Sequence, residues 1–199
     1  MKLISEFNDQ ELNFITEGKD DEKKYVIEGI FAQANNKNRN GRIYPREVMS
    51  SAIGKYNRDQ VAPGRAVGEL NHPEGPTVNL DKVSHKIDNL VLEGNDVMGK
   101  ATILNTPMGE VVKGLLDGGV KLGVSTRGMG SLQRNNDAMI VKDDFILNAV
   151  DIVQDPSAPS AFVNGVMEGV EWVWNNGIIE AQTIEQMETE IKKAPRSDL

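Results

Sequence analysis

Short stretches of apolar and β-branched residues, set apart by glycine, asparagine and charged turns, recur along most of the chain. Segments of this length and composition are typical of β-strands. Two of them, 83–92 and 97–104, flank the turn Glu93-Gly94-Asn95-Asp96 and predict a β-hairpin. The full set of expected strands is 25–34, 65–70, 83–92, 97–104, 121–127, 138–141 and 145–153.

Two segments show helical spacing instead. In residues 45–56 apolar side chains recur every three or four positions, and the leading proline suits a first helical turn. A second helix is expected over 107–116, capped by Asn105 or Thr106 and stopped by the glycine pair at 118–119. Many strands with few helices, mostly joined between sequence neighbours, predict an α+β fold. We expect mainly an antiparallel β-barrel, closed or nearly closed, with a few flanking helices.

The two ends of the chain differ in composition from its middle. Residues 1–24 are rich in charge and poor in pattern, so we expect a flexible N-terminal arm there. Residues 180–199 are polar and charged, and we expect a C-terminal tail. The region between them, 25–179, is then the folded domain.

Charge and composition narrow the possible functions. The chain has 199 residues and a formal net charge of −8, which argues against nucleic acid as a partner. It has no cysteine, which excludes thiol catalysis and disulfides. No apolar run is long enough to span a membrane. No spaced cluster of ligands indicates a metal, and we expect no cofactor.

With no cysteine and only two histidines, the chain has few ways to build a nucleophilic site. A serine hydroxyl is a weak nucleophile until a neighbouring base takes its proton. Ser125 lies late in an expected strand, and the glycines after it allow a substrate to approach the backbone closely. His72 stands at the end of another expected strand and precedes a proline, which favours an extended backbone. Ser125 and His72 are therefore the candidate nucleophile and base.

A third residue is needed to orient the imidazole. Asp151 lies in the apolar run Ala149–Val153, where a carboxylate is costly unless it is paired, and a histidine partner would explain it. Glu69 is the alternative, although it is so near His72 in sequence that it can point to the opposite side of the chain. His85 is the alternative base, but its place in an alternating strand indicates an inward, buried residue.

The site also needs donors for an oxyanion. The backbone N–H groups of Gly128 and Gly130 are candidates, and Arg127 is a candidate source of positive charge, directly or through a water. Each candidate also has a purely structural interpretation. A serine among glycines is common at tight packing positions, His-Pro is common in loops, and a buried aspartate can simply accept hydrogen bonds. Spacing alone leaves the function open.

Five segments of the chain match, in the same order, the sequence motifs of a known protein family. In order they are Ile27–Phe31 (IEGIF), Asn38–Pro45 (NRNGRIYP), Gly68–Pro73 (GELNHP), Gly123–Leu132 (GVSTRGMGSL) and Asp155–Pro159 (DPSAP). They resemble the prohead (capsid assembly) proteases of large tailed phages. One segment alone would be weak, but five in the same order are specific.

The resemblance implies a serine endopeptidase related in fold to the herpesvirus assemblins. Those enzymes carry a serine, a histidine and a third orienting residue on a β-barrel. By motif, His72 matches the family histidine in Asn-His-Pro, and Ser125 matches the first serine after Gly-Val. Asp151 follows Ser125 by 26 positions, which is similar to the spacing of the third residue in the assemblins.

The family also implies cleavage after glutamate, with Ile or Leu two residues earlier. Such sequences occur at Ile178–Glu180, Ile4–Glu6 and Ile15–Glu17, outside or at the edge of the expected domain. We therefore expect self-cleavage after Glu180, with the arm as a further place for it. A pocket selective for glutamate needs a cation, and the candidates are Arg65, Arg127 and Lys121.

By the same resemblance, the expected substrates are phage scaffold or core proteins and the major capsid protein. The expected location is the prohead core in the host cytoplasm, and by analogy we expect a homo-oligomer, a dimer or higher. The alternative is a non-enzymatic prohead scaffold or core component that keeps the protease fold. An unrelated β-barrel binding module is a third hypothesis, in which Asp151 has no histidine partner.

Overall fold

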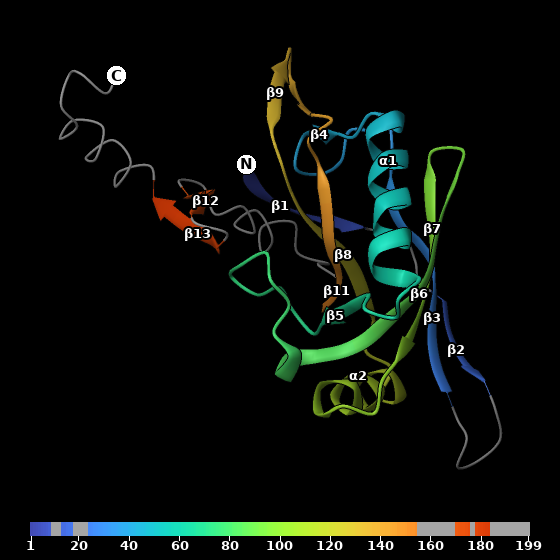
Figure 1. Cartoon of the computed structure of the whole chain (residues 1–199). Helices are drawn as coiled ribbons and strands as arrows, with labels where there is room; N and C mark the ends of the chain where they lie inside the picture. Colours follow the sequence, from blue (N-terminus) through green and yellow to red (C-terminus); the bar gives the residue numbers. More distant parts are fainter. Residues whose placement is uncertain (9–12, 18–23, 155–169, 176–177, 184–199) are drawn as a thin grey trace, which may run out of the picture.

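The computed structural model describes residues 1–8, 13–17, 24–154, 170–175 and 178–183 (Figure 1). The helices are α1 (Arg46–Tyr56) and α2 (Pro107–Asp117), with a π-helical turn at Asn57–Val61 and a 3-10 turn at Leu80–Lys82. The strands are β1 (Lys2–Asn8), β2 (Asn13–Glu17), β3 (Lys24–Gln33), β4 (Arg42–Ile43), β5 (Val67–Glu69), β6 (Val83–Glu93), β7 (Asp96–Ile103), β8 (Leu122–Gly130), β9 (Leu132–Asn135), β10 (Ala138–Val141), β11 (Ile146–Gln154), β12 (Val170–Asn175) and β13 (Ile178–Thr183).

The predicted strands between residues 25 and 153 are all present to within a few residues, and so are both helices. Helix α2 begins as predicted, because the Thr106 hydroxyl accepts a hydrogen bond from the Gly109 amide at 3.1 Å and Pro107 opens the first turn. Neither α1 nor α2 is long and apolar enough to cross a membrane, and the same holds for every helix in the described segments.

Two antiparallel sheets form the body of the molecule. One has the strand order β2-β3-β7-β6-β5 and the other the order β1-β8-β11. A parallel bridge between Leu70 and Ile152 joins the end of β5 to β11, so the two sheets meet edge to edge there. A smaller sheet, β4-β10-β9, adds one parallel pairing between β4 and β10.

The described strands do not close into a barrel, so the expected assemblin-type barrel is not confirmed. Strand β1 is the outer strand of one main sheet and β2 is the outer strand of the other, with no ladder between them in the described residues. Apolar patterns along a sequence identify strands and hairpins, whereas closure depends on a pairing between distant strands that no local pattern records.

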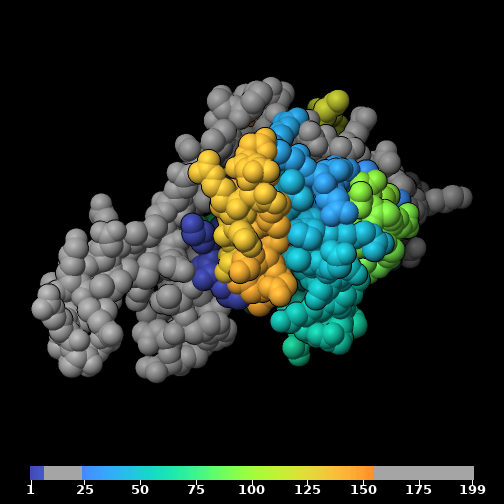
Figure 2. All heavy atoms as spheres, turned by 90° about the horizontal axis from the view of Figure 1, so that it is seen from above, coloured from blue at the N-terminus to red at the C-terminus, as the bar shows by residue number. Residues whose placement is uncertain are grey.

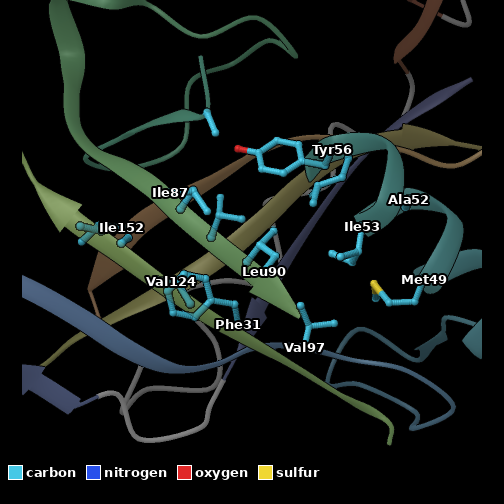
Figure 3. Close-up of a cluster of buried hydrophobic side chains, with 14 of the residues drawn as sticks. Phe31, Met49, Ala52, Ile53, Tyr56, Ile87, Leu90, Val97, Val124 and Ile152 are labelled. Atoms are coloured by element: carbon cyan, nitrogen blue, oxygen red, sulfur yellow. The ribbon is translucent and has the colours of Figure 1, made fainter. Parts of the chain in front are cut away.

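The core lies between α1 and the inner faces of the two main sheets (Figure 3). Helix α1 contributes Ile53 and Tyr56, which are 5 % and 2 % exposed, and these pack against apolar residues from β3, β6, β7 and β8. Phe31 of β3 fits closely over Gly99 of β7, where a Cβ atom would lie 2.3 Å from the phenyl ring. This packing holds the two sheets together and fixes the strands that carry the site.

The N-terminal arm is where prediction and structure differ most. Residues 2–8 were expected to be flexible, but they form β1 and pair with β8 along its full length. Ile4 is 1 % exposed and belongs to the core. The segment is held by its ladder with β8 and by burial of the consecutive residues Leu3 and Ile4, which show no alternating pattern that would predict a strand.

The C-terminal hairpin crosses the expected start of the tail. Strands β12 and β13 pair antiparallel, and Glu180 stands opposite Val173 within this ladder. The residue expected at the head of a tail therefore belongs to a strand. The predicted loop at 155–159, and the tail beyond residue 183, lie outside the described residues.

Candidate active site

Ser125, His72 and Asp151 form one hydrogen-bonded chain. The Ser125 hydroxyl lies 2.6 Å from His72 Nε2, and His72 Nδ1 lies 2.8 Å from Asp151 Oδ2. A carboxylate can only accept, so His72 donates from Nδ1, and Nε2 is left to accept from the serine hydroxyl. Three segments that lie far apart in sequence thus meet with the polarity that a nucleophile, a base and an orienting acid require.

The sheet fixes two of these three residues. Ser125 lies in β8, the central strand of its sheet, and is 2 % exposed. Asp151 lies in β11 and is the register partner of Ser125 in the antiparallel ladder. Cross-strand partners place their side chains on the same face. The ladder alone therefore places the serine and the aspartate on one face of the sheet, whatever the position of the histidine.

His72 comes from the loop after β5. The Asn71 backbone takes the left-handed conformation with φ of 68°, which asparagine tolerates better than most residues, and its amide donates to the Ile152 carbonyl at 2.8 Å. This turn anchors the loop to β11, one residue from Asp151. The imidazole is the most accessible part of the site, with 23 % of the side chain exposed, so a substrate can reach it.

Asp151 is buried and carries four hydrogen bonds. Besides His72, its partners are the Glu69 amide at 3.0 Å and two nitrogens of Arg127 at 2.8 Å and 3.2 Å. Burial raises the pKa of the Asp151 carboxyl, but the hydrogen bonds and charges of His72 and Arg127 outweigh it and hold that pKa below its ordinary value. Asp151 is therefore ionised and ready to hold the imidazole in one orientation.

Arg127 lies inside the protein beside Asp151. Its side chain is fully buried, and its remaining donors bind the carbonyl oxygens of Gly75 at 2.8 Å and Thr77 at 3.2 Å. It also lies 3.6 Å from the Glu69 carboxylate. With these partners the guanidinium faces inward and positions Asp151, and its role toward the substrate or the oxyanion stays a prediction.

Glu69 is not the partner of His72. Its carboxylate accepts from the Asn79 amide at 2.8 Å and pairs with Arg127, so it lies on the far side of Asp151 from the imidazole. The structure therefore brings Asp151, and not Glu69, to the histidine. Glu69 and Asn79 instead close the loop that carries His72 back against the end of β5.

Gly128 has a packing role, and its role as an oxyanion donor stays a prediction. It is paired on both sides, with Ile4 of β1 and Leu147 of β11. A Cβ atom at this position would lie 2.5 Å from the Phe145 ring. The need for glycine therefore comes from Phe145, and the backbone of Gly128 is engaged within the sheet.

The other candidates lie apart from the triad. Arg65 and Lys121 are exposed, just before β5 and β8 respectively, so their part in binding substrate stays a prediction. His85 is fully buried, as its alternating strand predicted, and bonds to the Val150 carbonyl at 2.8 Å. Burial lowers the pKa of His85, so it is a neutral structural histidine. The described residues include no group of three or more histidine and carboxylate side chains that could hold a metal ion.

Sequence reasoning missed the buried pair of Arg127 and Glu69. A signal was present, because Arg127 follows Ser125 by two residues in a strand and must share its face. A charge at that position of a buried strand requires an opposite charge nearby. The second acidic residue of the site, Glu69, supplies it.

Comparisons with known proteins identify the family of this chain. The family described as prohead core protein serine protease matches residues 10–171. The prohead core protein protease of Enterobacteria phage T4 is 38% identical over 163 residues, which cover 80% of this chain and 72% of that relative. The solved structure of the bacteriophage T4 capsid assembly protease superposes with a TM-score of 0.72 at 33% identity, over 76% of this chain and 97% of that one. This chain therefore belongs to the prohead core protein serine protease family.

Proposed function

We propose that this protein is a serine endopeptidase in which Ser125 is the nucleophile, His72 the general base and Asp151 the residue that orients His72. The observation that carries the proposal is the continuous chain from the Ser125 hydroxyl through the imidazole to the buried carboxylate, with bonds of 2.6 Å and 2.8 Å. Three hydrogen-bonded side chains of these types add little to the stability of the fold where the histidine is partly open to solvent, and they suit a nucleophilic site.

The reaction follows from these positions. His72 Nε2 takes the proton of the Ser125 hydroxyl while the oxygen attacks the substrate carbonyl, and Asp151 stabilises the imidazolium that forms. His72 then gives that proton to the leaving amine. Water, deprotonated in turn by His72, hydrolyses the acyl-enzyme and regenerates the serine. Arg127 keeps Asp151 ionised and fixed throughout, which preserves the tautomer that the reaction needs.

The proposed substrates are peptide bonds that follow glutamate, with Ile or Leu two residues earlier, in the scaffold or core proteins and the major capsid protein of an assembling prohead. The proposed location is the prohead core in the host cytoplasm, and the proposed assembly is a homo-oligomer. The family match and the T4 relative named as a prohead core protein protease support this reading. A relation in fold to the herpesvirus assemblins is part of the proposal, and its support is the two antiparallel sheets that meet at the end of β5 and at β11.

Self-processing is part of the same proposal. Ile178-Ile179-Glu180 carries the expected pattern, and cleavage after Glu180 would remove residues 181–199. Because Glu180 lies within the β12–β13 ladder, the hairpin must open before the bond can enter an active site. Processing after Glu180 is therefore expected to occur between molecules and to depend on protein concentration.

Intact mass over time tests the proposal. The wild-type chain, purified and concentrated, should lose residues 181–199, and Ser125→Ala should stay whole. Ser51→Ala is the matched control, because Ser51 is exposed on α1 and the same hydroxyl is removed far from the triad. Equal trimming of wild type and Ser125→Ala would contradict the proposal. If neither chain is trimmed, self-processing after Glu180 is refuted.

A further inference from the structure

The first strand of the chain lies directly beside the nucleophile. β1 runs antiparallel to β8, with Glu6 opposite Thr126 and Phe7 opposite Ser125. Phe7 is therefore the residue of β1 nearest to Ser125 along the ladder, and the peptide bond between Glu6 and Phe7 is one of the two that flank this position. An extended peptide commonly binds a protein by adding a strand to the edge of a sheet. β1 lies in the same way, as an outer strand hydrogen-bonded to β8.

The Glu6 side chain is buried in a pocket made for a carboxylate. Arg42 Nη1 donates to Glu6 Oε1 at 2.8 Å, the Tyr44 hydroxyl donates to the same oxygen at 3.0 Å, and Asn40 Nδ2 donates to Oε2 at 2.7 Å. Only 8 % of the Glu6 side chain and 7 % of the Arg42 side chain are exposed. Three donors around one buried carboxylate distinguish glutamate from its neutral analogue glutamine by charge.

The pocket is built by the domain and not by β1. Asn38 shapes it, because its side-chain oxygen accepts from the backbone amides of Asn40 and Arg42 at 3.0 Å and 2.9 Å. Arg42 lies in β4, which pairs with β10. In the space-filling view of Figure 2, the blue first residues of the chain border the yellow and orange part of the surface. Burial raises the pKa of Tyr44, so its hydroxyl stays protonated and able to donate.

The family match covers the residues of the pocket but does not reach β1, the strand that fills it. The family match begins at residue 10, so it includes the pocket residues 40–44 but leaves out β1. The occupant also has the sequence pattern of the proposed substrate, since Ile4 stands two residues before Glu6 and is 1 % exposed. The pocket residues thus lie within the matched range, and the strand that fills the pocket has the sequence pattern of the proposed substrate.

We propose that Arg42, Tyr44 and Asn40 form the pocket that selects glutamate before the cleaved bond, and that β1 occupies the substrate groove as a substrate-like strand of the chain itself. This inference rests on the proposed function. It assigns the substrate cation to Arg42, where sequence analysis offered Arg65, Arg127 and Lys121.

In this arrangement the protein can cleave its own peptide bond between Glu6 and Phe7. The Ser125 oxygen bonds to the Glu6 carbonyl carbon, the bond from that carbon to the Phe7 nitrogen breaks, and His72 passes the serine proton to the new Phe7 amine. Water then adds its hydroxide to the acyl carbon and returns a proton to Ser125. The product carboxylate stays on Glu6, and loss of residues 1–6 opens the groove for other substrates.

Peptide cleavage tests the pocket. The probes are a peptide of residues 1–10 and the same peptide with glutamine in place of Glu6, and kcat/KM is measured for each with the full-length protein. Wild type should prefer the glutamate peptide strongly. In Arg42→Gln the ratio of the two kcat/KM values should fall by about 30-fold or more, because one partner of a buried charge pair is removed. Tyr44→Phe removes only a hydroxyl, keeps the ring, and should lower the ratio by a smaller factor.

The outcomes separate this inference from the proposed function. If neither wild type nor Glu6→Ala, in which β1 has lost its anchor, cleaves either peptide, both claims are overturned. Cleavage that prefers glutamate, with an unchanged ratio in folded Arg42→Gln and in Tyr44→Phe, leaves the protease standing and overturns the pocket. Thermal unfolding of each variant shows whether it is folded.

A second variant tests the occupancy of the groove by β1. Glu6→Ala removes the anchor of β1, so the KM for a peptide of residues 175–184 should fall relative to wild type that has been checked by mass to be uncleaved. An unchanged KM overturns the occupancy. Loss of residues 1–6 from wild type but not from Ser125→Ala supports it directly.

Discussion

Asp151 stands opposite Ser125 in the ladder between β11 and β8, and His72 bridges the two side chains from a separate loop. The sheet thus sets the distance between nucleophile and acid, and only the histidine depends on a loop for its position. The backbone amides of Glu69 and Asn71 hold the chain just before the histidine, through the Asp151 carboxylate and the Ile152 carbonyl respectively. The site is therefore rigid on its buried side and accessible at His72.

Asp151→Asn should lower kcat by a factor on the order of 10²–10⁴ with little change in the fold, because an amide no longer fixes the required tautomer of His72. The measurement is the steady-state cleavage of a peptide that contains Ile-x-Glu. Asp143→Asn makes the same chemical change at an exposed position and should leave kcat unchanged. A near-normal kcat in Asp151→Asn would show that another group orients the histidine.

Arg127→Met should destabilise the protein by about 3–5 kcal/mol, because it leaves buried carboxylates without their partner. Urea unfolding measures this difference. The double variant Arg127→Met with Glu69→Gln should lose less than the sum of the single changes, since Glu69 is then neutral beside the methionine. Additive losses would mean that Arg127 and Glu69 do not interact, despite their separation of 3.6 Å.

Stability should fall as the pH falls through the range in which histidine titrates. Burial lowers the pKa of His85 in the folded protein, so below about pH 6.5 the unfolded chain takes up a proton that the folded protein resists. The stabilisation is complete above that pH and is lost progressively below it. We expect the loss in unfolding free energy between pH 7.5 and 5.5 to be about 1 kcal/mol larger in wild type than in His85→Gln. Equal losses in wild type and His85→Gln would show that His85 does not cause the pH dependence of the unfolding free energy.

Gly68→Ala should destabilise the protein by several kcal/mol, on the order of the largest overpacking effects. A Cβ atom at this position would lie 2.0 Å from the Val150 carbonyl oxygen and 2.4 Å from His85 Nε2. Gly54→Ala is the matched control, because nothing lies within 4 Å of its Cβ position in α1, and it should stabilise the helix by about 0.5–1 kcal/mol. Thermal unfolding of both variants gives the comparison, and a stable Gly68→Ala would contradict the close packing of β5 on β11.

The sequence predicted most of this fold because its strands and helices carry local signals. The turn at residues 93–96 specifies its hairpin, and Thr106 with Pro107 specifies the start of α2. β1 was not predicted, because its pairing with β8 joins residues more than a hundred positions apart and no local pattern reports such a pairing.

In the candidate site, too, features with a local sequence signal were predicted and features set by distant contacts were not. Ser125, His72 and Asp151 were identified from residue types, motifs and the cost of a buried carboxylate, and the structure brings the three together. The partners of Arg127 and Gly128 were not predicted, because they come from the loop at 75–77 and from Phe145. Contacts between segments decide such roles, and a single sequence does not contain them.

The most direct test of the central claim is the peptide-cleavage kcat/KM of wild type, Ser125→Ala and Ser51→Ala, each shown to be folded. We expect Ser125→Ala to lose at least about 10³-fold in kcat/KM and Ser51→Ala to match wild type. Cleavage by Ser125→Ala at a rate close to that of wild type would contradict the account, because the bond would then be broken without the hydroxyl at the centre of the proposed site.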